Sequence, residues 1–163
     1  MFSKTHPDYV GMQVLNTILG GYFGSRLMKN IREEKGYTYG IGSAVVSLMH
    51  GGYFFITSEV GAEVCSPALT EIYNELEILR REPVAEDELQ MVKNYMLGSF
   101  LKSIDGAFNL ADRWKGIMFY NLGYDYYERY IKTVSMITPE ELMALAQKYF
   151  GKENMSELVV GKK

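Results

Sequence analysis

The 163 residues, 47% of them hydrophobic, suffice for one compact domain with a core and leave little room for a second. The formal charge of −3 comes from 17 basic and 20 acidic side chains spread along the chain, which leaves no basic patch to neutralise phosphates. Nucleic acid is therefore not an expected partner. A single cysteine, Cys65, excludes an internal disulfide framework and a multi-thiolate metal site. No apolar run approaches the roughly 20 residues that a membrane span needs, so no membrane is expected as a partner either.

Two helices are predicted at the start of the chain. Apolar residues recur at helical spacing from Val10 to Leu19, which predicts a helix that begins near Pro7 and stops at Gly20-Gly21. Ser25 is expected to cap a shorter helix. Gly36 lies where a left-handed residue would end that helix.

After Gly36 the apolar period changes to two, which predicts a strand. One face of this strand is expected to carry Tyr37, Tyr39, Ile41, Ser43 and Val45, and the other Thr38, Gly40, Gly42 and Ala44. The run from Tyr53 to Val60 is rich in aromatic and β-branched residues and predicts a second strand, with His50-Gly51-Gly52 as the hairpin connection.

The rest of the chain is predicted to be mainly helical. Helices are expected from Ser66-Pro67 to Pro83, from about Ala85 to Ile104, after Asp105-Gly106, from Tyr126 to Val134, and from the capping box Thr138–Glu141 to Gly151. A final short strand is expected over Ser156 to Val160.

These elements predict a single α+β domain over residues 1–163, in which helices pack on one face of a mainly antiparallel sheet. Three strands are few for that amount of helix, so we expect that an upstream strand is missing and that the chain is a fragment of a longer protein. The loss would leave an exposed sheet edge, through which the chain is expected to form homo-oligomers.

The sequence offers no catalytic centre. Hydrolytic zinc needs several His or carboxylate ligands at helical spacing, whereas His6 and His50 lie in separate loop-like segments and no H-x-x-E-H motif is present. The serine motif G-x-S-x-G is absent as well. Neither a catalytic residue nor a metal ligand is therefore predicted in this chain.

Two groups of side chains are candidates for binding. A tyrosine cluster can form either a binding surface or packing between helices with the hydroxyls reaching water; it comprises Tyr120, Tyr124, Tyr126, Tyr127 and Tyr130. Arg32 lies in the last turn of the short helix, and Tyr39 lies seven residues later on the strand. A reversal at Gly36 can bring the guanidinium and the phenol to one rim, where both could hydrogen-bond a peptide carbonyl. The alternative for Arg32 is a helix C-terminal residue that interacts only with the dipole and water.

The segment from Val14 to Ala44, VLNTILGGYFGSRLMKNIREEKGYTYGIGSA, resembles the C-terminal halves of pitrilysin-type (insulinase-family) zinc peptidases, a family that includes mitochondrial processing peptidase. The shared pattern consists of Leu15-Asn16, Gly20-Gly21, Ser25-Arg26-Leu27, and Arg32 followed seven residues on by Tyr39. Pro83-Val84 and Glu88-Leu89 resemble the family's later helices, which extends the likeness over nearly the whole chain.

The resemblance implies the metallopeptidase fold shared by LuxS and processing peptidases. It also implies that zinc sits in a catalytic half that this chain lacks, carried on the same parent chain or on a separate subunit. Arg32 and Tyr39 would then contact the backbone of a peptide substrate. The main alternative is a proteolytically inactive assembly subunit with the same fold, and a third is a free-standing small-ligand module, which would require a closed pocket.

Overall fold

The computed structural model describes residues 1–161. Its elements are α1 (Tyr9–Asn16), the π-helices η1 (Thr17–Gly21) and η2 (Met28–Glu34), β1 (Thr38–Leu48), β2 (Gly51–Val60), the 3-10 turn η3 (Ala62–Val64), α2 (Cys65–Arg81), α3 (Glu86–Lys102), α4 (Ala107–Phe119), α5 (Tyr126–Met136), α6 (Pro139–Tyr149) and the 3-10 turn η4 (Lys152–Asn154). Among these residues no helix has the length and apolar character needed to cross a membrane.

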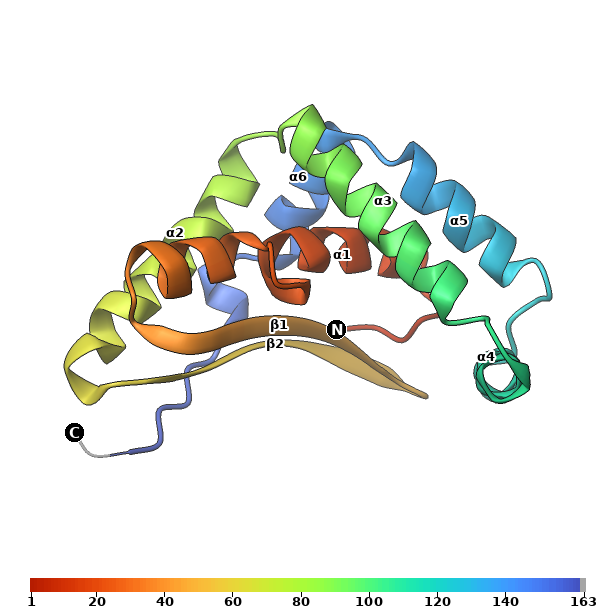
Figure 1. The fold of residues 1–163 in the computed structure, drawn as a ribbon, viewed down its shortest axis with the longest axis horizontal. Coiled ribbons are helices and arrows are strands. Elements are labelled where there is room, and N and C mark those ends of the chain that lie inside the picture. The colour runs from red at the N-terminus through yellow and green to blue at the C-terminus, as the bar shows by residue number, and fades with distance from the viewer. Residues whose placement is uncertain (162–163) are drawn as a thin grey trace.

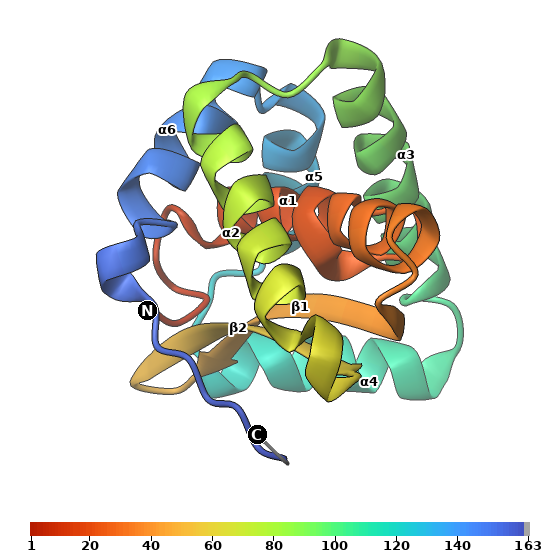
Figure 2. The same cartoon turned by 90° about the vertical axis from the view of Figure 1, so that its left-hand side faces the viewer.

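The strands β1 and β2 form an antiparallel hairpin, and the helices lie over one of its faces (Figures 1 and 2). Helix α1 and its π-helical continuation η1 rest on β1, and α2, α3, α5 and α6 pack around them. The predicted α+β arrangement with helices on one face is therefore confirmed.

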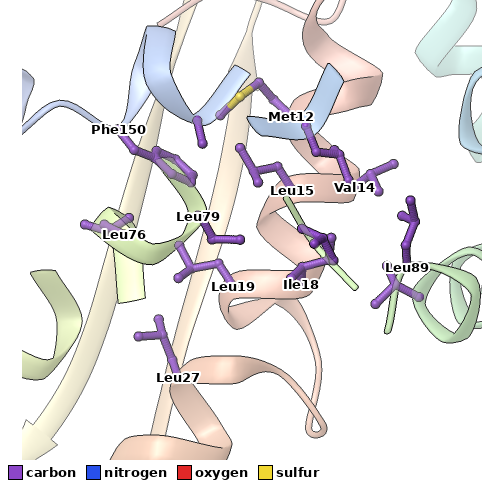
Figure 3. Packing of buried hydrophobic residues seen from close by; sticks show 14 of the residues in the cluster. Met12, Val14, Leu15, Ile18, Leu19, Leu27, Leu76, Leu79, Leu89 and Phe150 are labelled. Carbon is purple, nitrogen blue, oxygen red and sulfur yellow. The ribbon is translucent and has the colours of Figure 1, made fainter. Parts of the chain in front are cut away.

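The core is centred on the apolar face of α1 and η1. Met12, Leu15, Ile18 and Leu19 are fully or almost fully buried there, and they meet residues of α2, α3 and the segment after α6 (Figure 3). Apolar residues at three- and four-residue spacing place these side chains on one side of the helix, which is why the sequence pattern located it correctly.

Glycine at position 20 allows this helix to approach the sheet closely. A Cβ atom on Gly20 would lie 2.9 Å from the backbone nitrogen of Ser43 and even closer to its hydroxyl oxygen. The hydroxyl of Ser43 in turn donates a 2.8 Å hydrogen bond to Oδ1 of Asn16. The Leu-Asn and Gly-Gly parts of the sequence pattern thus dock the first helix onto β1.

The predicted strand over Ser156 to Val160 is wrong. This segment pairs with neither β1 nor β2, and Leu158 and Val160 are exposed. Apolar and β-branched composition favours a strand only where a neighbouring backbone can accept its hydrogen bonds. Within residues 1–161 the sheet has only the two strands of the hairpin, so no such partner is present.

Two local predictions also need correction. The hairpin turn is formed by Met49 and His50, whereas Gly51 and Gly52 begin β2. A Cβ on Gly52 would collide with the carbonyl oxygens of Phe2 and Val46, so this glycine serves close packing rather than the turn. The hydroxyl of Ser25 is buried without a hydrogen-bond partner among the described residues, and it therefore does not cap the short helix.

Helix α4 stands apart from the rest of the fold (Figure 1). Ile117 is its only buried residue, and other apolar side chains of its sequence pattern, such as Trp114 and Met118, are more than half exposed. The helix forms as the sequence predicts, but most of its apolar surface has no cover within residues 1–161.

Candidate functional site

The turn between η2 and β1 positions both predicted site residues. The backbone N–H of Tyr37 donates to the carbonyl of Ile31 at 3.0 Å, and that of Lys35 donates to Asn30 at 2.9 Å. Between them Gly36 has φ of +66°, the left-handed conformation that glycine adopts without steric cost. The predicted termination of the short helix at Gly36 is confirmed.

Arg32 lies in the last turn of η2, where its side chain is half-buried. The centre of its guanidinium lies 4.7 Å from the centroid of the Phe23 ring, a cation–π contact that fixes the side chain against the preceding loop. Arg32 makes no ion pair with any carboxylate in residues 1–161, so its hydrogen-bond donors remain available.

Tyr39 is fully exposed, with a relative accessibility of 101%. Thr38 is aligned with Val60 and Ile41 with Ser58, so Tyr39 and Gly40 together stand opposite the single residue Glu59. This β-bulge breaks the strand alternation. The prediction that Tyr39 shares a face with Ile41 and Ser43 is wrong for this reason, because those two residues are buried whereas Tyr39 projects into solvent.

The structure brings Arg32 and Tyr39 to one open depression of about 670 Å³. Its walls are formed by Arg32, Glu33, Gly36, Tyr37, Thr38, Tyr39, Glu59 and Gly61. The sequence argument missed the carboxylates of Glu33 and Glu59, as well as the ring of Phe23 behind Arg32. Hairpin pairing could have found Glu59, because its distance from the turn places it opposite the start of β1.

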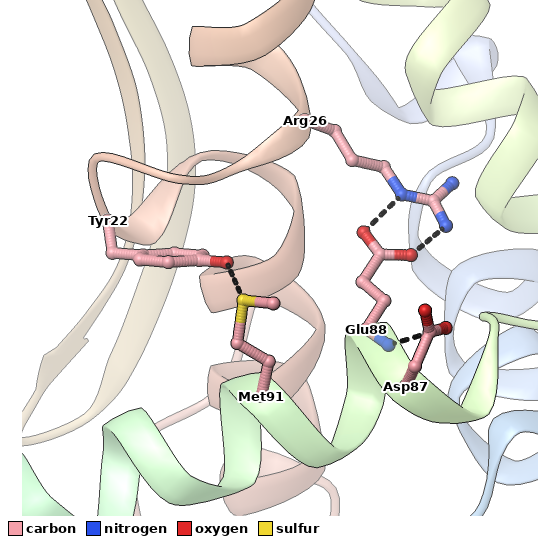
Figure 4. Close-up of polar contacts among 5 residues, drawn as sticks. All are labelled: Tyr22, Arg26, Asp87, Glu88 and Met91. Atoms are coloured by element: carbon pink, nitrogen blue, oxygen red, sulfur yellow. Dashed lines mark hydrogen bonds and ion pairs between the residues drawn. The ribbon is translucent and has the colours of Figure 1, made fainter.

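A bidentate ion pair anchors the start of the helix that carries Arg32. Nε and Nη2 of Arg26 donate to the two carboxylate oxygens of Glu88 on α3, at 2.9 and 2.6 Å (Figure 4). On the same helix Met91 accepts a hydrogen bond from the hydroxyl of Tyr22 at 3.9 Å. These contacts hold the loop from Tyr22 to Arg26 that presents Phe23 to Arg32.

The histidines take the structural positions that the sequence suggested. The ring of His6 stacks on Phe2 with centroids 4.2 Å apart, and its Nδ1 accepts a hydrogen bond from the backbone of Asp8. His50 lies in the exposed hairpin turn. Within residues 1–161 no three His, Cys, Asp or Glu side chains are grouped closely enough to hold a metal ion.

The fold defines a domain class in which helices cover one face of an antiparallel sheet, and comparison with known proteins gives its family. Residues 1–96 match the family described as peptidase M16 inactive domain, and the chain belongs to this family. The resemblance to pitrilysin-type zinc peptidases is thereby confirmed, and the chain is a non-catalytic domain of a zinc-protease family. The closer likeness to mitochondrial processing peptidase stays a prediction.

Relatives and solved structures agree with this assignment. The chain is 31% identical over 102 residues, 63% of its length, to the uncharacterized zinc protease YmxG of Bacillus subtilis, of which it covers 25%. It is 25% identical over 108 residues, 66% of its length, to the probable inactive metalloprotease YmfF of the same organism, and again covers 25% of that protein. The peptidase M16 inactive domain from Pseudomonas fluorescens superposes with a TM-score of 0.83 and 28% identity, over 90% of this chain and 35% of that one. A protease from Helicobacter pylori has the same fold, with a TM-score of 0.82 and 19% identity over 94% of this chain and 37% of that one.

Proposed function

We propose that this domain holds an extended peptide substrate for a zinc-bearing catalytic half of a metallopeptidase. The observation that carries the proposal is the exposure of Tyr39 on the bulge of β1, beside an Arg32 that no carboxylate in residues 1–161 neutralises. A bulge that turns an aromatic side chain into solvent is typical of a site that re-aims a residue toward a ligand.

The two side chains supply complementary hydrogen-bond donors for a peptide backbone. Arg32 offers several N–H groups in a planar fork, and a bond from this charged group to a carbonyl is worth about 1.5–3 kcal/mol. The neutral phenol of Tyr39 contributes about 0.5–1.5 kcal/mol. Because backbone carbonyls are common to all peptides, this pair would position a substrate without reading its sequence.

The carboxylates of Glu33 and Glu59 add a preference to this site. Both line the depression beside Arg32 and Tyr39. A lysine or arginine side chain, or the free N-terminus of a peptide, would pair with them, whereas an acidic peptide would be repelled. The proposed substrate is therefore a neutral or basic peptide in extended conformation.

In this proposal zinc is bound by the catalytic half and not by the present chain. His6 stacks on Phe2 and accepts a hydrogen bond from the backbone of Asp8, His50 lies in the exposed hairpin turn, and within residues 1–161 no three His, Cys, Asp or Glu side chains are grouped to hold a metal ion. Two relatives are named as a zinc protease and as an inactive metalloprotease, so either an active parent or an inactive assembly subunit is compatible with the family.

The test is peptide turnover by the domain combined with its catalytic half, with Arg32→Ala compared against Lys29→Ala. Lys29 lies exposed on the same helix η2 and lines no part of the depression, so it matches the loss of charge. Substrate binding predicts that only Arg32→Ala lowers kcat/KM. If both variants retain full turnover, Arg32 does not bind the substrate and the proposal is wrong. A complex that assembles but turns over no peptide would favour the inactive assembly subunit.

A further inference from the structure

A second cavity, of about 430 Å³, shares no lining residue with the depression at Arg32 and Tyr39. Its walls come from α1, β1, α3, α4 and α5, and from the N-terminal segment. Cavities of roughly 300–1,000 Å³ with a few converging polar groups are typical of small-ligand sites. The residues that carry the argument are Lys4, Tyr9, Arg113, Tyr126, Tyr127 and Tyr130.

The charge of this cavity is entirely positive. Among the described residues Lys4 and Arg113 line it, and no Asp or Glu does. Neither cation forms an ion pair within residues 1–161, and the adjacent Asp112 is held by Lys115. Nη2 of Arg113 donates instead to the hydroxyl of Ser103.

Lys4 and Arg113 are far apart in the sequence, but both line this cavity. The ammonium of Lys4 lies 4.4 Å from the ring centroid of Tyr120. A Cβ atom added to Gly116 on α4 would lie 3.9 Å from this ammonium and 3.8 Å from the hydroxyl of Tyr127. Arg113 lies three residues before Gly116 on α4. The guanidinium of Arg113 lies 5.8 Å from the ring centroid of Tyr127. Both positive charges therefore line the same partly buried space without a carboxylate partner in residues 1–161, and an anion in that space would interact favourably with each of them.

The tyrosines present free donors to the same space. The hydroxyl of Tyr9 accepts a 3.0 Å bond from Gln13 but donates to no acceptor, and those of Tyr126 and Tyr130 have no hydrogen-bond partner in residues 1–161. Burial raises the pKa of all three phenols, so they stay protonated and act as donors at neutral pH.

We propose that this cavity binds a small organic anion, a carboxylate or phosphate group carried on an aromatic or apolar body. Arg113 and Lys4 bind the anionic group, the tyrosine hydroxyls add hydrogen bonds, and the rings of Phe100 and Tyr127 face the apolar body. The peptide site at Arg32 and Tyr39 plays no part in this binding, so either assignment can fail without the other. The sequence left two alternatives for the tyrosine cluster, a binding surface or packing between helices. Tyr126, Tyr127 and Tyr130 line the cavity, whereas Tyr124 is exposed and does not line it.

Binding at this site would fasten α4 to the rest of the domain. The helix buries only Ile117 and contributes Arg113, while Tyr9, Tyr126 and Tyr130 belong to α1 and α5. An anion that bridges these elements would reduce local opening of α4. Trp114, the only tryptophan of the chain, is the next residue after Arg113 and reports on that event.

The experiment titrates the full chain with phenyl phosphate, benzoate and the uncharged benzamide, following Trp114 fluorescence and calorimetric heat. We expect phenyl phosphate and benzoate to saturate a single site and benzamide to bind at least about tenfold more weakly, because it lacks the charge-assisted bonds. Equal binding of benzamide, or absence of saturable binding by both anions, would overturn the proposal.

Variants separate the cavity from the general electrostatics of the surface. Arg113→Met and Lys4→Met should each weaken phenyl phosphate binding at least about tenfold, and Arg113→Lys should recover part of the loss. Lys132→Met is the matched control, since this lysine is exposed on α5, forms no ion pair within residues 1–161 and does not line the cavity. Equal weakening by Lys132→Met would show non-specific attraction and would also overturn the proposal. Unchanged far-UV circular dichroism establishes that each variant is folded.

Discussion

Arg26 and Glu88 join the loop before η2 to α3 through two parallel hydrogen bonds, although 62 residues separate them in the sequence (Figure 4). Their side chains are only 19% and 29% exposed, so water screens the pair less than it screens a surface ion pair. Arg26 belongs to the Ser25-Arg26-Leu27 part of the resemblance and Glu88 to its Glu88-Leu89 part. Neither residue lines the depression that contains Arg32 and Tyr39, so the position of the pair is structural.

Replacing Arg26 with Ala should lower the free energy of unfolding by about 2–3 kcal/mol, because Glu88 would be left partly buried without its partner. The matched control is Arg81→Ala, which removes a 75% exposed arginine bound to Glu77 and should cost less than about 1 kcal/mol. Urea unfolding of both variants measures the difference. Equal losses would contradict the role assigned to the Arg26–Glu88 pair.

Arg32→Ala should lower kcat/KM for a peptide substrate roughly ten- to a hundredfold in the complex with the catalytic half, since one charge-assisted bond is lost. Tyr39→Phe should cost less, on the order of 0.5–1.5 kcal/mol in transition-state binding. Its control is Tyr124→Phe, which alters another exposed phenol outside the depression. A lowered melting temperature with normal turnover per folded molecule would instead indicate a structural role for Arg32.

Gly20→Ala should destabilise the domain by about 1–3 kcal/mol, because the added methyl group meets the backbone and hydroxyl of Ser43. Gly98→Ala provides the opposite case, since Gly98 lies within α3 and has open space around its Cβ position. That substitution should stabilise the helix by roughly 0.5–1 kcal/mol. Thermal and urea denaturation would detect the opposite signs, and a Gly20→Ala variant as stable as the parent would contradict this account of Gly20.

Asp8 connects the start of α1 to the end of α6, and its contribution should depend on pH. Hydrogen bonds from Lys148 at 2.7 Å and Tyr149 at 2.6 Å hold the pKa of this carboxyl below its ordinary value. A lowered folded-state pKa stabilises the protein above the unfolded aspartate pKa of about 3.9 and loses that effect as the pH falls through the folded-state value. Asp8→Asn should therefore be less stable than the parent at pH 7, and the gap should close below pH 4. A gap that persists in acid would exclude this linkage.

The open hairpin should promote association of the isolated chain. Within residues 1–161 neither β1 nor β2 pairs with a third strand, and unpaired edges recruit other strands. Sedimentation velocity at increasing concentration should show oligomers, and Phe55→Lys on the exposed side of β2 should reduce them because edge charges oppose pairing. A chain that stays monomeric at every concentration would show that these unpaired edges do not recruit a second copy.

Much of the fold is determined by interactions between residues close in the sequence, which sequence patterns predict. The helical period of Val10 to Leu19, the left-handed glycine at Gly36 and the capping box at Thr138 each specify structure through contacts with near neighbours, and each is observed. The capping box is complete, with Thr138 accepting from the backbone of Glu141 and the Glu141 side chain accepting in return. The lack of a zinc ligand motif is equally a matter of residue types and spacing.

Tertiary structure decided the features that depend on distant residues. Ser156 to Val160 has strand composition but pairs with no strand, because pairing needs a neighbour that composition cannot supply. Tyr39 faces solvent because the register with β2 inserts a bulge opposite Glu59, which a strict period of two does not foresee. The positive cavity likewise exists only because folding brings Lys4 beside α4, more than 100 residues away in the chain. Interactions between near neighbours can be predicted from the local sequence. Strand register, strand pairing and cavity shape depend on packing between segments that are distant in the sequence.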